Sequence, residues 1–198
     1  KILANIAREN RFPVYIVGGF VRDLILSRPG IDFDIVVEGD AIALGQHLIQ
    51  TYGGKLVSHN RFGTAKWQIN DIRSQLTRAM SPQDPPDPFS LPDNLDLISA
   101  RSEFYEFPTA LPTIERSSIK LDLHRRDFTI NTLAMRLDGR HYGDLYDYWG
   151  GLDDLKKGSI RVLHSLSFID DPTRMIRAVR FEHRFKFHIE TRTLQLID

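Results

Sequence analysis

Two apolar segments near the start of the chain, separated by a glycine turn, most strongly limit the fold. Val14–Val17 predicts a short buried strand, and Gly18–Gly19 ends it before a helical stretch. A second apolar segment, Ile31–Val37, then predicts another strand, and Asp32 and Asp34 lie near its start. A strand, a turn, a helix and a second strand predict a sheet with helices packed on it.

Asp32 and Asp34 are two residues apart in the second expected strand, so their side chains point to the same face of the sheet. Two neighbouring carboxylates repel each other unless a positive charge lies between them, and hard oxygen ligands favour Mg²⁺. A paired-carboxylate site beside a glycine turn suits metal-dependent phosphoryl transfer. An Asp-x-Asp pair alone is also common on protein surfaces, so a metal site needs support from elsewhere in the chain.

Asp96 is the third carboxylate candidate. It lies among Leu95, Leu97 and Ile98, in a segment that predicts another strand. If that strand lies beside the strand of Asp32 and Asp34, three carboxylates converge on one site, and Asp96 can also accept the proton of an attacking hydroxyl. The alternative is an aspartate on an edge strand that faces water.

The turn at Gly18 and Gly19 is a candidate phosphate site. Glycine lets backbone N–H groups approach a ligand closely, and the start of the following helix adds a positive dipole end, with Arg22 nearby. An ordinary turn between a strand and a helix is the alternative. Neither the dinucleotide fingerprint G-x-G-x-x-G nor the P-loop pattern occurs in the sequence, which argues against both of those site classes.

Two further clusters can contact a nucleotide. Arg125, Arg126 and Asp127 offer two phosphate donors and a carboxylate that can accept from a ribose hydroxyl. Asp171 and Arg174 are three residues apart at an expected helix start, where an acceptor and a donor together can recognise the edge of a base. The alternatives are a solvated charge cluster for the first group and a helix cap with an ion pair for the second.

Composition excludes several classes. The 198 residues suffice for one large domain, or for one domain and the start of another, and the net charge is zero, so overall charge does not identify a partner. The absence of Cys excludes disulfides, thiol nucleophiles and Cys-ligated zinc. The sequence has no signal peptide and no apolar run long enough to span a membrane, so we expect a cytoplasmic protein. The chain begins at Lys1 and ends at Asp198 within an expected helix, which suggests a segment of a longer protein.

The remaining pattern indicates an α+β fold. Several short strands with intervening helices predict an α+β or α/β arrangement, and the chain becomes clearly helical from Asp171 onward. Five prolines between Pro82 and Pro92 predict an extended, solvated loop, within what looks like an insertion near residues 71–94. The purpose of this insertion is not readable from the sequence.

These pieces occur in an order that resembles one family. The motifs are Val17-Gly18-Gly19-x-Val21-Arg22-Asp23, Asp32-x-Asp34-Ile35-Val36-Val37-Glu38-Gly39-Asp40, Arg61-Phe62-Gly63-Thr64-Ala65, Asp122-Leu123-x-Arg125-Arg126-Asp127-Phe128-Thr129-Ile130-Asn131, Gly150-Gly151-Leu152-x-Asp154-Leu155 and Asp171-Pro172-x-Arg174-Met175-x-Arg177-Ala178-x-Arg180-Phe181. In this order the chain resembles the class II tRNA nucleotidyltransferases, the bacterial CCA-adding enzymes and their A-adding and CC-adding relatives. Bacterial poly(A) polymerase belongs to the same family.

The resemblance implies a nucleotidyltransferase head with a mixed β-sheet flanked by helices, followed by the start of an α-helical neck. The head would cover residues 1–145, and residues 146–198 would begin the neck and carry the base-reading motif. Most of the surface that grips tRNA would lie beyond Asp198.

The resemblance also implies roles for the candidate residues. Asp32 and Asp34 would hold Mg²⁺, with Asp96 as a further catalytic carboxylate. Asp171 and Arg174 would act as a protein template for the base. The other nucleotide-binding candidates are Gly18, Gly19, Arg22, Arg125, Arg126, Asp127, Asn131, Arg177 and Arg180.

The expected function is template-independent transfer of AMP or CMP, from ATP or CTP, to the 3′ end of tRNA. A poly(A) polymerase and a non-catalytic RNA-binding module of the same fold are the alternatives. The product, A, CC or CCA, and the oligomeric state stay open. One departure is Asp170, which stands where the family has a longer Glu, so the support of Arg174 by this acid is also open.

Overall fold

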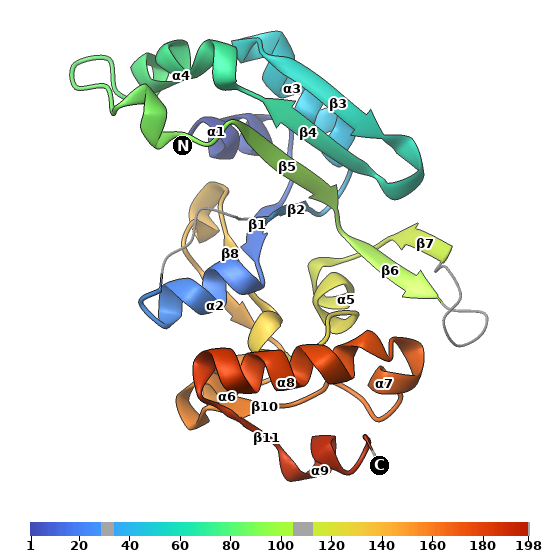
Figure 1. The fold of residues 1–198 in the computed structure, drawn as a ribbon. Helices are drawn as coiled ribbons and strands as arrows, with labels where there is room; N and C mark the ends of the chain where they lie inside the picture. The colour runs from blue at the N-terminus through green and yellow to red at the C-terminus, as the bar shows by residue number, and fades with distance from the viewer. Residues whose placement is uncertain (29–33, 105–112, 198) are drawn as a thin grey trace. The chain divides into compact units, whose positions relative to one another are not determined.

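The computed structural model describes residues 1–28, 34–104 and 113–197 (Figure 1). The chain divides into two compact units, and each is built from separated stretches of sequence. The first unit contains residues 1–16, 30–100 and 135–144, and the second contains residues 17–29, 101–134 and 145–198. The division into a head at residues 1–145 and a neck from residue 146 stays a prediction.

The described residues form helices and strands that are interspersed along the chain (Figure 1). The α-helices are α1 (Ile2–Glu9), α2 (Gly19–Ile25), α3 (Ala41–Tyr52), α4 (Arg73–Met80), α5 (Ile119–His124), α6 (Gly151–Lys157), α7 (Ser167–Asp170), α8 (Thr173–Phe185) and α9 (Thr191–Leu194). The strands are β1 (Val14–Val17), β2 (Asp34–Val37), β3 (Lys55–His59), β4 (Thr64–Gln68), β5 (Asn94–Ser99), β6 (Arg101–Phe104), β7 (Thr113–Arg116), β8 (Leu133–Arg136), β9 (Leu145–Asp147), β10 (Ser159–Ile160) and β11 (His188–Ile189). Short 3₁₀ turns join several of these elements.

The main sheet has the strand order β3-β4-β5-β2-β1-β8-β9, and β1 and β8 contain residues of both units. Strand β2 pairs with β5 in parallel, whereas β4 pairs with both β3 and β5 in antiparallel orientation. Two smaller sheets pair β6 with β7 and β10 with β11. The mixed sheet with its helices confirms the predicted α+β class.

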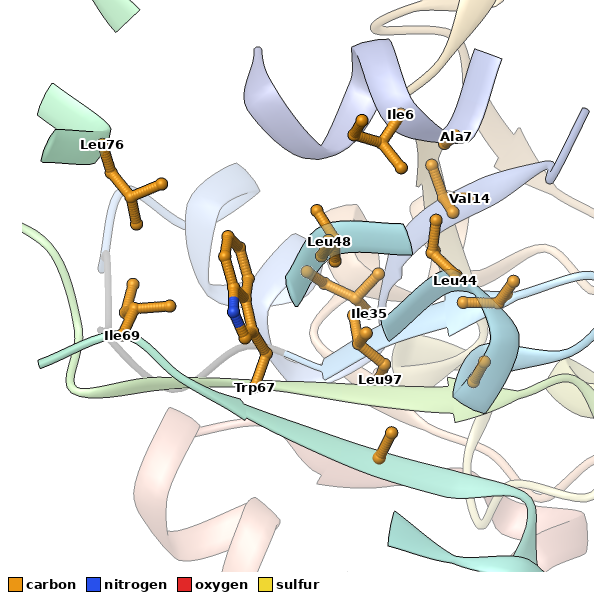
Figure 2. Packing of buried hydrophobic residues seen from close by; sticks show 13 residues of the cluster. Ile6, Ala7, Val14, Ile35, Leu44, Leu48, Trp67, Ile69, Leu76 and Leu97 are labelled. Carbon is orange, nitrogen blue, oxygen red and sulfur yellow. The ribbon is translucent and has the colours of Figure 1, made fainter. Parts of the chain in front are cut away.

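The core of the first unit lies between the sheet and helices α1, α3 and α4 (Figure 2). Leu44 and Leu48 of α3 are one helical turn apart and fully buried, as the spacing of apolar residues predicts. Trp67 of β4 is buried among them, and its indole N–H donates to the carbonyl of Gly53 at 2.9 Å. Burial of each such side chain stabilises the fold by about 1.5–3 kcal/mol. This packing fixes strands β2, β4 and β5, which carry the candidate carboxylates and their neighbours.

Helix α3 begins directly after a residue whose side chain caps it. Asp40 caps it, and its Oδ1 accepts from the backbone N–H groups of Ile42 and Ala43 at 2.9 and 3.1 Å. The cap lies three residues after the end of β2. It therefore holds the chain in place just beyond the strand that carries Asp34.

Helix α8 organises the second unit. Its buried face consists of Arg174, Ala178, Phe181 and Phe185, which follow helical spacing. Phe181 stacks on Phe185 and meets Phe128 edge-on, with ring centroids 5.7 and 5.8 Å apart. Arg174 is the one charged residue of this otherwise apolar face.

Within the region 71–94, the predicted loop from Pro82 to Pro92 has no α-helix or strand, and a helix precedes it. Helix α4 occupies Arg73–Met80, and a 3₁₀ turn at Pro88–Ser90 is capped by Asp87. Leu76 of α4 is buried in the core of the first unit, so its apolar contact outweighs the polar character of the segment. In the part of the chain that the structure describes, no helix is long and apolar enough to cross a membrane.

Candidate functional site

In the first unit the two described candidate carboxylates belong to adjacent strands. Strand β2 lies beside β5 in parallel, and Asp34 is directly opposite Asp96 in the register. Residues that are opposite on neighbouring strands point to the same face, and the strands are about 4.8 Å apart. Asp34 is exposed and Asp96 is partly exposed, so both carboxylates can reach a ligand. Asp32 lies outside the described residues.

A pocket of about 350 Å³ lies over this pair of strands. Asp34, Asp96, His59, Thr64 and Lys66 contribute to its lining. The ammonium of Lys66 on β4 lies 3.2 Å from Oδ1 of Asp96, and these two residues are also opposite each other in the register of β4 and β5. The pocket therefore combines two carboxylates with one cation.

The donor chemistry of this pocket fits a hard divalent cation. Two neighbouring carboxylates supply the oxygen ligands that Mg²⁺ prefers, and Mg²⁺ commonly completes its shell with water and substrate oxygens. Within residues 1–28, 34–104 and 113–197, no group of three or more His, Cys, Asp or Glu side chains is close enough to hold a metal ion. Asp34 and Asp96 would thus form part of a metal site, and the role of Asp32 stays a prediction.

The turn at Gly18 has a conformation that favours glycine. Its φ is +66°, and a Cβ at this position would lie 2.6 Å from a terminal guanidinium nitrogen of Arg126. The backbone N–H of Gly18 donates to the carbonyl of Leu133 at 2.8 Å, so in this arrangement it is not free for a phosphate. Gly18 leaves room for Arg126 beside the turn.

Arg125 and Arg126 share one buried partner, the carboxylate of Asp122 on α5. Its Oδ1 accepts from Arg125 at 3.0 and 3.1 Å, and its Oδ2 accepts from Arg126 at 3.2 Å. Arg125 also donates to Glu103 at 3.1 Å. The Nε of Arg126 is buried and has no hydrogen-bond partner in the described part of the chain. Both arginines are therefore oriented by the protein before any ligand arrives.

Asp127 and Asn131 are buried and hydrogen-bonded to each other. The Asn131 amide donates to Asp127 at 2.8 Å and accepts from Arg22. The other oxygen of Asp127 accepts from Nε and a terminal nitrogen of Arg177, at 2.8 and 2.6 Å. Arg22 is also buried, whereas Arg177 is about half exposed.

Asp171 and Arg174, at the start of α8, differ in how far their side chains are exposed to solvent. The carboxylate of Asp171 is partly exposed and accepts from the backbone and the hydroxyl of Thr173 at 3.0 and 2.6 Å. Arg174 is buried and donates to Oγ of Ser167 at 2.6 Å and to the carbonyl of Arg125 at 3.0 Å. The Nε of Arg174 lies 3.8 Å from Asp171, an ion pair but not a hydrogen bond. The structure thus contains the expected ion pair, but the residue directly before α8 is Pro172, and no side chain in the described part of the chain caps the helix. Arg174 is held by Ser167 and by the backbone of Arg125.

In the part of the chain that the structure describes, no hydrogen bond or ion pair joins Arg174 to Asp170. The carboxylate of Asp170 instead lies 3.8 Å from Nε2 of His164. Burial lowers the pKa of His164; the charge of Asp170 opposes this change, and those of His124 and Arg174 reinforce it. Arg180 is exposed on α8.

The sequence reasoning missed three supporting side chains. Asp122 precedes Arg125 and Arg126 by three and four residues, which is helical contact spacing, so this partner was readable. Lys66 and Ser167 carried no such signal, because their contacts depend on which elements lie side by side. The roles of all the candidate residues toward a ligand stay predictions.

The chain matches the model of the poly A polymerase head domain over residues 14–161. It is 46% identical over 197 residues to the A-adding tRNA nucleotidyltransferase of Geobacter sulfurreducens, covering 98% of this chain and 20% of that protein. It is 43% identical over 196 residues to the A-adding tRNA nucleotidyltransferase of Halalkalibacterium halodurans, covering 99% of this chain and 41% of that protein. The chain therefore spans less than half the length of these relatives.

Two solved structures are similar to this chain along almost all of its length. One is an apo form of a CCA-adding enzyme, with a TM-score of 0.84 and 44% identity, covering 99% of this chain and 42% of that one. The other is the Thermotoga maritima CCA-adding enzyme in complex with tRNA, with a TM-score of 0.78 and 41% identity, covering 99% of this chain and 39% of that one. This chain is therefore similar to both structures in fold and in amino-acid sequence.

Proposed function

Because this chain belongs to the poly A polymerase head-domain family, we propose that it carries the catalytic and nucleotide-binding residues of a tRNA nucleotidyltransferase. The reaction is template-independent transfer of AMP, CMP or both, from ATP or CTP, to the 3′ end of tRNA. The observation that carries the proposal is the position of Asp34 directly opposite Asp96 on neighbouring parallel strands. A paired-carboxylate site of this kind is what nucleotidyl transfer requires.

In the reaction the 3′ hydroxyl of the RNA attacks the α-phosphorus of the nucleotide. A new oxygen–phosphorus bond forms, the bond to the bridging oxygen of the β-phosphate breaks, and pyrophosphate leaves. Asp34 and Asp96, with Asp32, would hold Mg²⁺, which when bound supplies positive charge for the developing negative charge on the phosphate. Asp96 would accept the proton of the attacking hydroxyl.

The groups that we propose for nucleotide binding belong to the second unit. Arg125 and Arg126 carry donors for phosphate oxygens, and Asp122 orients both guanidinium groups. Asp171 and Arg174 would recognise the edge of the base, with an exposed acceptor on one residue and a fixed donor on the other. The relatives are named for adding A, CC or CCA, and the proposal leaves that choice to experiment. We place the reaction in the cytoplasm, where tRNA ends are made and repaired.

The test uses the full-length protein and three tRNAs, which end before CCA, after the first C and after CC. Each tRNA receives both ATP and CTP, one of them labelled, in the presence of Mg²⁺, and products are resolved at single-nucleotide length. Addition of one to three residues supports the proposal, and the tRNA that is extended identifies the subtype. Asp34→Asn serves as the inactive control.

A poly(A) polymerase is the second candidate, because the matching family model carries that description. It would extend each RNA with a long run of A, whether or not the RNA is a tRNA. If neither short nor long products appear while the protein still binds RNA, the non-catalytic RNA-binding module is correct, and the proposed activity is wrong.

A further inference from the structure

Lys66 is the one lysine or arginine among the described residues that line the pocket over Asp34 and Asp96. Its ammonium lies 3.2 Å from Oδ1 of Asp96. We propose that Lys66 determines which form of the metal the pocket accepts. As a built-in counter-ion, it weakens the binding of a free divalent cation and favours a cation that arrives bound to a nucleoside triphosphate. The proposal rests on the proposed function.

The pairing of three strands places these side chains in one row. Asp96 of β5 is directly opposite Asp34 of β2 on one side and directly opposite Lys66 of β4 on the other. Residues that are opposite each other on neighbouring strands point to the same face of the sheet. Asp96 therefore lies between a carboxylate and an ammonium. The strand register, and not only the rotation of a long surface side chain, brings Lys66 to this position.

The ion pair between Lys66 and Asp96 can open. The side chain of Lys66 is 46% exposed and that of Asp96 is 43% exposed. In the described part of the chain, no other ion pair or hydrogen bond holds the ammonium of Lys66. An exposed pair of this kind contributes little to stability, and the lysine stem is flexible. A ligand of Asp96 can therefore displace the ammonium without disturbing the fold.

A free divalent cation meets two obstacles at Asp96. It competes with the ammonium of Lys66 for the same carboxylate, and the two positive charges repel each other at close range. Mg²⁺ binds carboxylate oxygens at about 2.1 Å, so a cation on Asp96 would lie within a few ångströms of an ammonium that stays near Oδ1. Lys66 therefore lowers the affinity of the pocket for the cation alone.

A metal–nucleotide complex meets the opposite effect. Its phosphates give the complex a net negative charge, so the ammonium of Lys66 attracts it. An ammonium that leaves Asp96 also has three N–H groups that can donate to phosphate oxygens. The effect of Lys66 on binding thus changes sign between a free cation and a cation that carries the nucleotide.

The test measures two equilibria in the full-length protein without RNA. The first is Mn²⁺ binding without nucleotide, followed by the paramagnetic resonance of free Mn²⁺, and the second is calorimetric binding of the magnesium complexes of ATP and CTP. Lys66→Met should lower the dissociation constant for Mn²⁺ about tenfold and raise that for the metal–nucleotide complex about threefold. Lys66→Arg keeps the charge and should stay near the wild type in both measurements.

Lys55→Met is the matched control. Lys55 lies on β3 of the same sheet and forms an exposed ion pair with Asp71, at 3.8 Å, outside the lining of this pocket. It should leave both dissociation constants unchanged. Asp34→Asn identifies the Mn²⁺ that is bound at the pocket, because that part of the binding should be lost.

Three results would overturn the proposal. They are Mn²⁺ binding by Lys66→Met that is no tighter than in the wild type, the same direction of change for Mn²⁺ and for the metal–nucleotide complex, and an equal change in Lys55→Met. If Lys66→Met does not fold, Lys66→Gln gives the same comparison. Because neither equilibrium depends on turnover, the absence of transfer to tRNA would contradict the proposed function without producing any of these three results.

Discussion

Asp34 lies directly opposite Asp96 on the neighbouring parallel strand, although most of the first unit's sequence separates the two residues. Their carboxylates leave the same face of the sheet, over one pocket. Asp96 has the ammonium of Lys66 as a neighbour at 3.2 Å. The two aspartates therefore have different surroundings although they face the same pocket.

Asp34→Asn should reduce nucleotide transfer at least about 100-fold, because it removes a metal-binding charge at the reaction centre. The side chain is exposed, so the melting temperature should stay near that of the wild type. Single-turnover transfer to a tRNA lacking its terminal A measures the effect. Asp71→Asn changes an exposed carboxylate of the same unit and is the control. Near-normal transfer by Asp34→Asn would contradict the paired-carboxylate mechanism.

Arg174→Ala should relax the discrimination of ATP and CTP against GTP and UTP by about 10- to 100-fold, because a donor to the base edge is lost. The measurement is the ratio of kcat/KM between the four nucleotides. Arg192→Ala, at an exposed arginine of α9, should leave this ratio unchanged. If Arg174→Ala kept the wild-type discrimination between the four nucleotides, Arg174 would have a structural role and no role in base recognition.

Asp122→Ala should lower the free energy of unfolding by about 3–5 kcal/mol, because it leaves two arginines without their buried partner. The carboxylate is fully buried and accepts from Arg125 and Arg126. Urea unfolding measures the change, and Asp153→Ala, at an exposed aspartate of α6, is the control. A loss similar to that of the control would show that the two arginines find other partners.

His164→Gln should flatten the dependence of stability on pH on the acid side of neutrality. Burial lowers the pKa of His164 from 6.5, so the unfolded chain takes up the proton at a higher pH than the folded protein does. The stabilisation from neutral His164 is therefore complete above pH 6.5 and declines as the pH falls below it. Melting temperatures between about pH 5 and pH 8 test this, with the exposed His183→Gln as the control. Parallel curves for His164→Gln and wild type would contradict it.

The sequence predicted strands β1, β2 and β5 of the first unit from their runs of apolar residues. The strand predicted at Val14–Val17 has the same bounds in the structure, and Asp34 and Asp96 each lie in a strand. The neighbour of β2 could not be predicted, since alternation determines which face a side chain takes but not which strand lies beside it. Whether Asp96 joins Asp34 was therefore open until the topology was known.

The candidate nucleotide-binding residues show a second limit of prediction from sequence, which concerns the burial of charged side chains. Arg174 and Arg177 are three residues apart on α8, yet Arg174 is buried and Arg177 is about half exposed. Burial of a guanidinium requires acceptors, and those of Arg174 are Ser167 and the backbone of Arg125. Every residue has a backbone carbonyl, so the sequence does not indicate which one accepts from Arg174. Only the three-dimensional structure identifies this contact.

The hydrogen bond from Arg174 to Ser167 limits which segments of related proteins can be joined in a chimaera of this region. Arg174 belongs to α8 and Ser167 to α7, so the arginine depends on a residue outside its own helix. A chimaera that takes α8 from one parent and a residue without a hydroxyl at position 167 from the other would bury a guanidinium donor without its partner. Helices α7 and α8 should consequently be inherited, and exchanged in engineering, as a single module.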